Sequence, residues 1–196
     1  MSKAGGREIR NRGVVITGAA GGLGTAFAER YASAGARLAL IDLDGAGAEA
    51  LAARLRVRGA TATALGCDIA DEAACTAAVV AAEAALGGID ILVSNAGISA
   101  RVLLRDATPE VARRVMAINY FGALHATQAA LASLVGRRGQ IVVVSSVAGF
   151  APLVGRTAYA ASKHALHGFF DSLRAELRGS GVSVLSSLGL SKKSGS

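Results

Sequence analysis

Two titratable side chains stand four residues apart in the segment Tyr159-Ala160-Ala161-Ser162-Lys163. In a helix, this spacing places the phenol of Tyr159 and the ammonium of Lys163 on one face. A free phenol titrates near ~10 and is a poor proton shuttle at neutral pH, but a nearby ammonium favours the phenolate. The pair could therefore exchange a proton with a bound molecule. Taken alone, the same spacing is also typical of an ordinary surface pair.

A glycine-rich turn follows the first apolar run of the chain, in Thr17-Gly18-Ala19-Ala20-Gly21-Gly22-Leu23-Gly24. Glycines permit backbone conformations closed to other residues, and they let backbone N–H groups approach a phosphate at a helix N-terminus. A glycine cluster alone is weak evidence in a chain with 25 glycines. The apolar run before it, the helical pattern after it and Asp42 at the end of the next apolar run strengthen the interpretation as a phosphate-binding turn.

The elements that must position these residues are read from the apolar pattern, in which short runs alternate with helical segments. Strands are expected at Val14–Thr17, Leu38–Ile41, Thr61–Cys67, Ile89–Ser94, Gln140–Ser145 and Val182–Leu185. Helices are expected at Gly22–Ala34, Gly45–Arg58, Asp71–Leu86, Pro109–Val135 and Thr157–Arg178. Thr108 offers an N-cap hydroxyl, and Gly35, Gly59 and Gly179 are expected to end their helices. Right-handed crossovers between such elements predict an α/β fold with a doubly wound parallel sheet of six strands, helices on both faces and ligands at the carboxyl ends of the strands.

Several separated motifs together resemble the short-chain dehydrogenase/reductase family. The glycine turn has the family's TGxxxGxG form, and the Tyr159–Lys163 segment has its YxxxK form. Ser94-Asn95-Ala96-Gly97 is similar to the family's NNAG, with Ser94 in place of the first asparagine. The match covers about residues 14–184, with the motifs in the family's order and spacing. The resemblance implies a Rossmann fold and a nicotinamide cofactor.

The expected cofactor site follows from the resemblance and from the chemistry of its acids. Its residues are Gly18, Gly22, Leu23, Gly24, Asp42, Asp68, Ile69, Asn95, Ala96, Gly97, Tyr159 and Lys163. A carboxylate at position 42 can accept hydrogen bonds from both ribose hydroxyls of the adenosine and would repel a 2′-phosphate, so NAD is favoured over NADP. Asp68 would meet the adenine, although it could equally cap the helix that begins near Asp71. The Asn-Ala-Gly segment could also be a plain turn.

The resemblance implies a catalytic set of Asn119, Ser146, Tyr159 and Lys163. Ser146 has the family spacing to Tyr159, and Ser145 should point to the other side of the strand. In this set Tyr159 exchanges the substrate proton, Ser146 hydrogen-bonds the substrate oxygen, and Lys163 also holds the nicotinamide ribose. Asn119, on a helix kink, would hold a water of the proton relay. The implied reaction is reversible hydride transfer between a carbinol carbon and the nicotinamide, with no metal.

The carboxyl end departs from the family pattern. Residues 1–12 and 191–196 are expected to be polar tails around one domain at residues 13–190. The family's seventh strand and its helical substrate lid have no counterpart in the residues after the sixth strand. The resemblance implies association through the helices at 109–135 and 157–178, which makes a homodimer plausible. Phe150, Leu153 and Val154 suggest an apolar alcohol or carbonyl substrate.

Composition argues against several other classes of protein. The formal net charge is +7, but basic residues near both ends carry much of the excess, and solvated tails are a simpler interpretation than a nucleic-acid partner. Cys67 and Cys75 have neither disulfide nor zinc spacing, and a reducing cytoplasmic setting is the default. The uncharged stretch at 115–136 is long enough to span a bilayer, but polar residues interrupt it and a buried helix is expected. Two readings remain open, namely an NAD-dependent oxidoreductase and a non-catalytic dinucleotide-binding module that lacks the lid.

Overall fold

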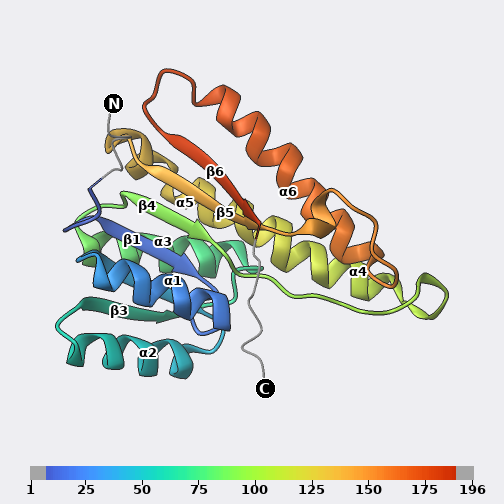
Figure 1. The fold of residues 1–196 in the computed structure, drawn as a ribbon, viewed down its shortest axis with the longest axis horizontal. Helices are drawn as coiled ribbons and strands as arrows, with labels where there is room; N and C mark the ends of the chain where they lie inside the picture. Colours follow the sequence, from blue (N-terminus) through green and yellow to red (C-terminus); the bar gives the residue numbers. More distant parts are fainter. Residues whose placement is uncertain (1–7, 189–196) are drawn as a thin grey trace, which may run out of the picture.

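The computed structural model describes residues 8–188 and forms one parallel sheet with helices on both faces (Figure 1). The strand order is β3-β2-β1-β4-β5-β6, and every neighbouring pair is parallel. The strands are β1 (Gly13–Thr17), β2 (Arg37–Asp42), β3 (Thr61–Gly66), β4 (Ile91–Ser94), β5 (Gln140–Ser145) and β6 (Ser183–Leu188). The helices are α1 (Gly22–Ser33), α2 (Gly45–Val57), α3 (Glu72–Leu86), α4 (Pro109–Met116), α5 (Gly122–Gly136) and α6 (Thr157–Glu176). The predicted doubly wound fold is confirmed.

Two hydrophobic cores lie on the two faces of the sheet. Helices α3, α5 and α6 pack on one face, and α1 and α2 pack on the other, against β1, β2 and β3. Successive residues of a strand point to opposite faces, so Val15 enters the first core while Val14 and Ile16 enter the second. Burial on both faces explains why these strands read as continuous apolar runs.

The order of strands fixes where a ligand can bind. Strand β1 lies between β2 and β4, so the chain leaves β1 and β4 toward helices on opposite faces. At such a switch point the two loops separate and leave a crevice at the carboxyl ends of the strands. The glycine turn follows β1, and the Asn95-Ala96-Gly97 segment follows β4.

The helix predicted at Pro109–Val135 is interrupted in its middle. A π-helical turn, Ala117–Phe121, separates α4 from α5 and contains Asn119. Such turns carry one extra residue in the helical ladder and occur often at functional sites. The sequence gives no periodic signal for this insertion, because the apolar character continues through it. Within residues 8–188, no helix is both long enough and apolar enough to cross a membrane.

Other boundaries differ from the prediction by a few residues. Thr108 occupies the N-cap position of α4, but its side chain makes no capping hydrogen bond. Strand β4 begins two residues later than expected, since the amide of Ile89 bonds to Ser133 Oγ. Strand β6 runs to Leu188, because it pairs in register with the whole of β5. Residues 189–196, which include the predicted tail at 191–196, lie outside the described part of the chain.

The described part of the amino-terminal segment is attached to the domain. The amide of Asn11 donates to the carbonyl of Gly35, and the carbonyl of Arg12 accepts from the amide of Arg37. Asn11 adopts a left-handed φ of 60°, a conformation that asparagine tolerates better than most residues. Arg12, which the charge distribution assigned to a solvated tail, instead forms an ion pair with the domain; residues 1–7 of the same predicted tail lie outside the described residues.

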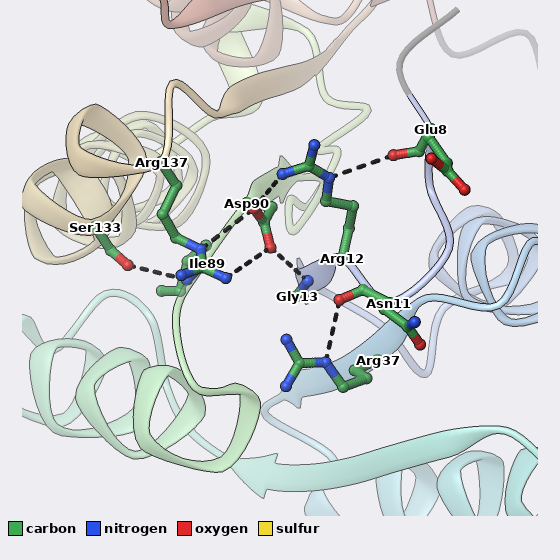
Figure 2. Close-up of polar contacts among 9 residues, drawn as sticks. All are labelled: Glu8, Asn11, Arg12, Gly13, Arg37, Ile89, Asp90, Ser133 and Arg137. Carbon is green, nitrogen blue, oxygen red and sulfur yellow. Dashed lines mark hydrogen bonds and ion pairs between the residues drawn. The ribbon is translucent and has the colours of Figure 1, made fainter.

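Asp90 joins three segments at the amino edge of the sheet (Figure 2). Its carboxylate is 2.9 Å from Arg12 Nη1 and 3.2 Å from Arg137 Nε, and it accepts a 2.8 Å hydrogen bond from the amide of Gly13. Burial by itself raises the pKa of this carboxyl, but the hydrogen bonds from Gly13, Arg12 and Arg137 outweigh it and hold the pKa below its ordinary value. The cluster is remote from the carboxyl-end crevice, so its role is structural.

We expect Asp90→Ala to lower the free energy of unfolding by about 2–4 kcal/mol at pH 7, because two guanidinium groups and a buried amide lose their acceptor. A carboxyl with a depressed pKa stabilises the fold above its unfolded pKa of about 3.9, and this contribution disappears as pH falls through the folded value. The difference between wild type and variant should therefore shrink in acid. Urea denaturation measures both effects, with the exposed Asp106→Ala as control; equal stability of all three proteins at pH 7 would contradict the assignment.

Candidate active site

A cleft of about 450 Å³ opens at the carboxyl ends of β1, β2, β3 and β4. It brings together ten of the residues that the sequence assigned to a cofactor: Gly18, Gly22, Leu23, Gly24, Asp42, Asp68, Ile69, Asn95, Ala96 and Gly97. The other two, Tyr159 and Lys163, are on α6 and do not line it. The cleft therefore contains the predicted dinucleotide residues, and the predicted proton-transfer pair lies outside its lining.

The glycine turn is packed too closely for other residues at two positions. A Cβ on Gly24 would lie 2.0 Å from the carbonyl oxygen of Gly18, and a Cβ on Gly18 would lie 2.7 Å from Ala96 Cα. Gly18 also has a φ of +66°, which favours glycine. A Cβ on Gly22, by contrast, would meet no atom within 4 Å. The turn thus holds the first turn of α1 against β1 while leaving open space at Gly22.

Asp42 connects the glycine turn to the end of β2. Its carboxylate accepts hydrogen bonds from the amide of Ala20 at 2.8 Å and from the amide of Asp44 at 2.9 Å. Asp44 in turn caps α2 by accepting from the amide of Gly47. The carboxylate at position 42 is therefore fixed at the rim of the cleft by two backbone amides.

The segment after β3 carries the second predicted acid of the cleft, Asp68. Asp71, and not Asp68, caps α3, because its carboxylate accepts from the amide of Ala74 at 3.0 Å. Asp68 accepts from the amide of Ala70 and lines the cleft beside Ile69. The structure thus decides against the capping alternative for Asp68.

Asn95 ties the loop after β4 to the glycine turn. Its Nδ2 donates to the carbonyl oxygens of Thr17 and Gly18, at 3.0 and 2.9 Å. The hydroxyl of Thr17 accepts from the amides of Asn95 and Ala96. These bonds bind two loops that belong to separate halves of the sheet, which is a stronger arrangement than the plain turn considered from the sequence.

Asn119, in the π-helical turn, is 1% exposed and fully paired. Its Oδ1 accepts from the amide of Ile98 at 2.8 Å, and its Nδ2 donates to the carbonyl of Ile98 and to Ser162 Oγ. Ser162 is part of the YxxxK segment and donates to the carbonyl of Tyr159. The extra residue of the π turn allows the side-chain amide of Asn119 to join the β4 loop to α6. These hydrogen bonds offset the cost of burying the polar amide.

Lys163 and Tyr159 lie on one face of α6, as predicted. Lys163 Nζ is 5.7 Å from the centre of the Tyr159 ring, and it donates to the carbonyl of Val144 at 2.9 Å. The ammonium stands at the side of the cleft, where a Cβ added to Gly97 would lie 3.9 Å from Lys163 Nζ. Burial lowers the pKa of Lys163 to about 8, so most molecules still carry the ammonium at neutral pH. A second cation, Arg156, approaches the same ring at 5.8 Å.

The two serines at the end of β5 have different surroundings. Ser145 is buried and its hydroxyl is 2.7 Å from His167 Nε2 on α6. Ser146 is partly exposed and accepts a 3.2 Å hydrogen bond from the amide of Ala148, at the start of a 3₁₀ turn that packs on α6. The two hydroxyls therefore have different partners, and the assignment of Ser146 to the substrate stays a prediction.

The sequence analysis missed several residues of the cleft: Gly21, Leu43, Cys67, Ile98, Arg114 and Ile118. Four of them adjoin predicted residues in the chain and could have been found from that position. Arg114 comes from α4 and Ile118 from the π-helical turn that follows it, and only the tertiary structure reveals the approach of these segments to the cleft. Burial raises the pKa of the Cys67 thiol, with contributions from neighbouring acids, so it is not an activated nucleophile. Among residues 8–188, no group of His, Cys, Asp or Glu side chains is arranged to hold a metal ion.

The family model described as short chain dehydrogenase matches residues 12–188. The chain belongs to the short-chain dehydrogenase family. It is 42% identical over 183 residues to dehydrogenase/reductase SDR family member 7B from Bos taurus, covering 90% of this chain and 56% of the relative. It is 39% identical to 2-(S)-hydroxypropyl-CoM dehydrogenase 3 from Xanthobacter autotrophicus, covering 90% of this chain and 70% of that relative.

Solved structures of short-chain dehydrogenases have the same fold. A short-chain dehydrogenase/reductase from Burkholderia phymatum, crystallised in complex with NAD, superposes with a TM-score of 0.86 at 33% identity. The superposition covers 92% of this chain and 65% of that one. The chain therefore spans little more than half the length of the Bos taurus relative, and that alignment covers 90% of this chain.

Proposed function

We propose that this protein is an NAD-dependent short-chain dehydrogenase that transfers a hydride between nicotinamide and a secondary alcohol or its ketone. The observation that carries the proposal is the position of Lys163, whose ammonium lies 3.9 Å from the Cβ position of Gly97 in the glycine-lined cleft. The ammonium is thus close to the loop after β4, and Asn95 of that loop is hydrogen-bonded to the carbonyls of Thr17 and Gly18 at the glycine turn. The complex of the Burkholderia relative with NAD supports the same choice of cofactor.

The residues of the cleft fit a dinucleotide. The space at Gly22 lies at the N-terminus of α1, where backbone amides and the helix dipole favour a phosphate. Asp42 at the end of β2 can accept hydrogen bonds from ribose hydroxyls, and Asp68 with Ile69 would contact the adenine. Gly18, Leu23, Gly24, Asn95, Ala96 and Gly97 complete the set that we assign to cofactor binding.

The chemistry at the substrate would be done by four side chains. The hydride-accepting carbon is supplied by the nicotinamide when it is bound. Tyr159 takes the hydroxyl proton of an alcohol, or returns it to the carbonyl oxygen in the reverse direction. Ser146 donates a hydrogen bond to the substrate oxygen, and the Lys163 ammonium stands 5.7 Å from the centre of the Tyr159 ring. Asn119 holds the β4 loop against α6 and keeps these groups in position.

The substrate is proposed to be apolar. Phe150, Leu153 and Val154 follow Ser146 in the chain and are exposed, Phe150 to 66% and Val154 to 89%. Exposed apolar side chains that follow Ser146 so closely in the chain suit an alcohol with a hydrophobic body. A homodimer through α4, α5 and α6 is part of the same proposal, by the resemblance alone.

Asp42 gives a test of the cofactor preference. We expect Asp42→Asn to weaken NADH binding moderately and to strengthen NADPH binding, because the amide removes the negative charge that repels a 2′-phosphate yet can still accept from Ala20 N. Asp42→Ala should relax the preference too, with some loss of stability. Fluorescence titration with both cofactors gives the ratio of dissociation constants. A wild-type protein that already prefers NADPH would contradict the assignment.

A non-catalytic dinucleotide-binding module is the second candidate, favoured by a cleft whose lining includes neither Tyr159 nor Lys163. Titrating NADH by fluorescence, and then screening secondary alcohols for reduction of NAD, separates the two. Binding with turnover supports the dehydrogenase, and binding with no turnover on any alcohol of a broad apolar panel supports the module. A protein that binds neither NADH nor NADPH would refute both.

A further inference from the structure

The lining of the cleft proposed for NAD is poor in positive charge, because the Lys163 ammonium stands at its side and donates to the carbonyl of Val144. Its described lining includes two carboxylates, Asp42 and Asp68, and a single cationic side chain, that of Arg114. The pyrophosphate of a dinucleotide carries two negative charges, and amides at a helix N-terminus supply only about half an elementary charge. In a concave site, uncompensated carboxylates repel an anionic ligand. A cation inside the cleft would therefore contribute more to the affinity for the dinucleotide than a cation on an open surface would.

Arg114 is directed to the cleft by its place on α4. It stands four residues before Ile118 of the following π-helical turn, and both residues line the same cleft. The adjacent Arg113 does not line the cleft and instead pairs with Glu110 at 2.7 Å. Within residues 8–188, the guanidinium of Arg114 has no hydrogen-bond acceptor and no ion-pair partner. It is therefore available to a ligand.

We propose that Arg114 is a cofactor-binding residue whose guanidinium pairs with the phosphates of the dinucleotide in the cleft that the glycine turn also lines. This inference rests on the function proposed above and adds a binding residue from α4. A guanidinium matches phosphate oxygens with two parallel N–H groups, so the pairing gives orientation as well as charge. Arg114 would thereby offset Asp42 and Asp68, which the adenosine needs for other contacts.

Binding of phosphorylated and unphosphorylated probes tests the proposal. Dissociation constants for NADH, ADP and adenosine are measured on wild type, Arg114→Ala, Arg114→Lys and Arg113→Ala, by NADH fluorescence and competition at low and high salt. We expect Arg114→Ala to weaken NADH and ADP roughly five- to tenfold at low salt, less at high salt, and to leave adenosine unchanged. Arg114→Lys should retain part of the affinity, and Arg113→Ala should behave as wild type. Arg114 is exposed, and circular dichroism would verify that each variant is folded.

The possible outcomes distinguish this inference from the function on which it rests. Unchanged ADP binding in Arg114→Ala would overturn the role of Arg114 alone. An equal loss for adenosine and ADP would also overturn it, since the guanidinium would then contact the base or ribose. A wild-type protein that binds neither NADH nor ADP would overturn the proposed function and this inference with it.

Discussion

Tyr159→Phe is expected to reduce turnover at least roughly a hundredfold while leaving the affinity for NADH within about twofold of wild type. The variant loses only the hydroxyl that would exchange the substrate proton, and its ring can keep the contact with the Lys163 ammonium. The measurement is the initial rate of NAD reduction with the best alcohol of the panel, together with a fluorescence titration of NADH.

Tyr120→Phe is a matched control for this experiment. Tyr120 lies in the π-helical turn and packs edge-on against Phe169. The control should retain wild-type rates. If Tyr159→Phe also retains them, Tyr159 is not the proton-exchanging group.

Gly24→Ala is expected to abolish measurable NADH binding. It should also lower the free energy of unfolding by several kcal/mol, about as much as an overpacking substitution in a hydrophobic core, or more. Its Cβ would lie 2.0 Å from the Gly18 carbonyl oxygen and 2.8 Å from Ala19 Cα. Both are backbone atoms, so relief requires the turn itself to move. Thermal unfolding and NADH fluorescence record the two effects.

Two further glycine variants separate loss of fold from loss of binding. Gly168→Ala, in α6, meets no atom within 4 Å and should leave NADH binding unchanged while raising stability by up to about 1 kcal/mol. Gly22→Ala also meets no atom, so its fold should be intact. Its NADH binding should nevertheless fall, because a dinucleotide would occupy that space. Normal NADH binding by Gly22→Ala and Gly24→Ala together would exclude the glycine turn as the phosphate site.

The sequence determined most of the fold by local means. The alternation of apolar runs with helical patterns predicted six strands, their order of appearance and the crossover helices, because buried parallel strands and amphipathic helices leave different periods in the chain. The glycines at 18 and 24 and the acids at 42 and 68 were identified from the family's motifs, together with their place near the carboxyl ends of β1, β2 and β3, which form one edge of the sheet. The family to which the chain belongs followed from the same motifs.

Only the tertiary structure decided which of these residues meet. The π turn at Asn119 leaves no periodic signal, and its hydrogen bonds to Ile98 and Ser162 join segments distant in sequence. The role of Asp90 as acceptor for Arg12 and Arg137 and the approach of Arg114 to the cleft are equally invisible in the pattern. Periodicity records which face of an element is buried, whereas these contacts depend on how whole elements pack against one another. For that reason the sequence supplied the candidate groups, and the packing of α4 against α6 and of α6 against the sheet determined their neighbours.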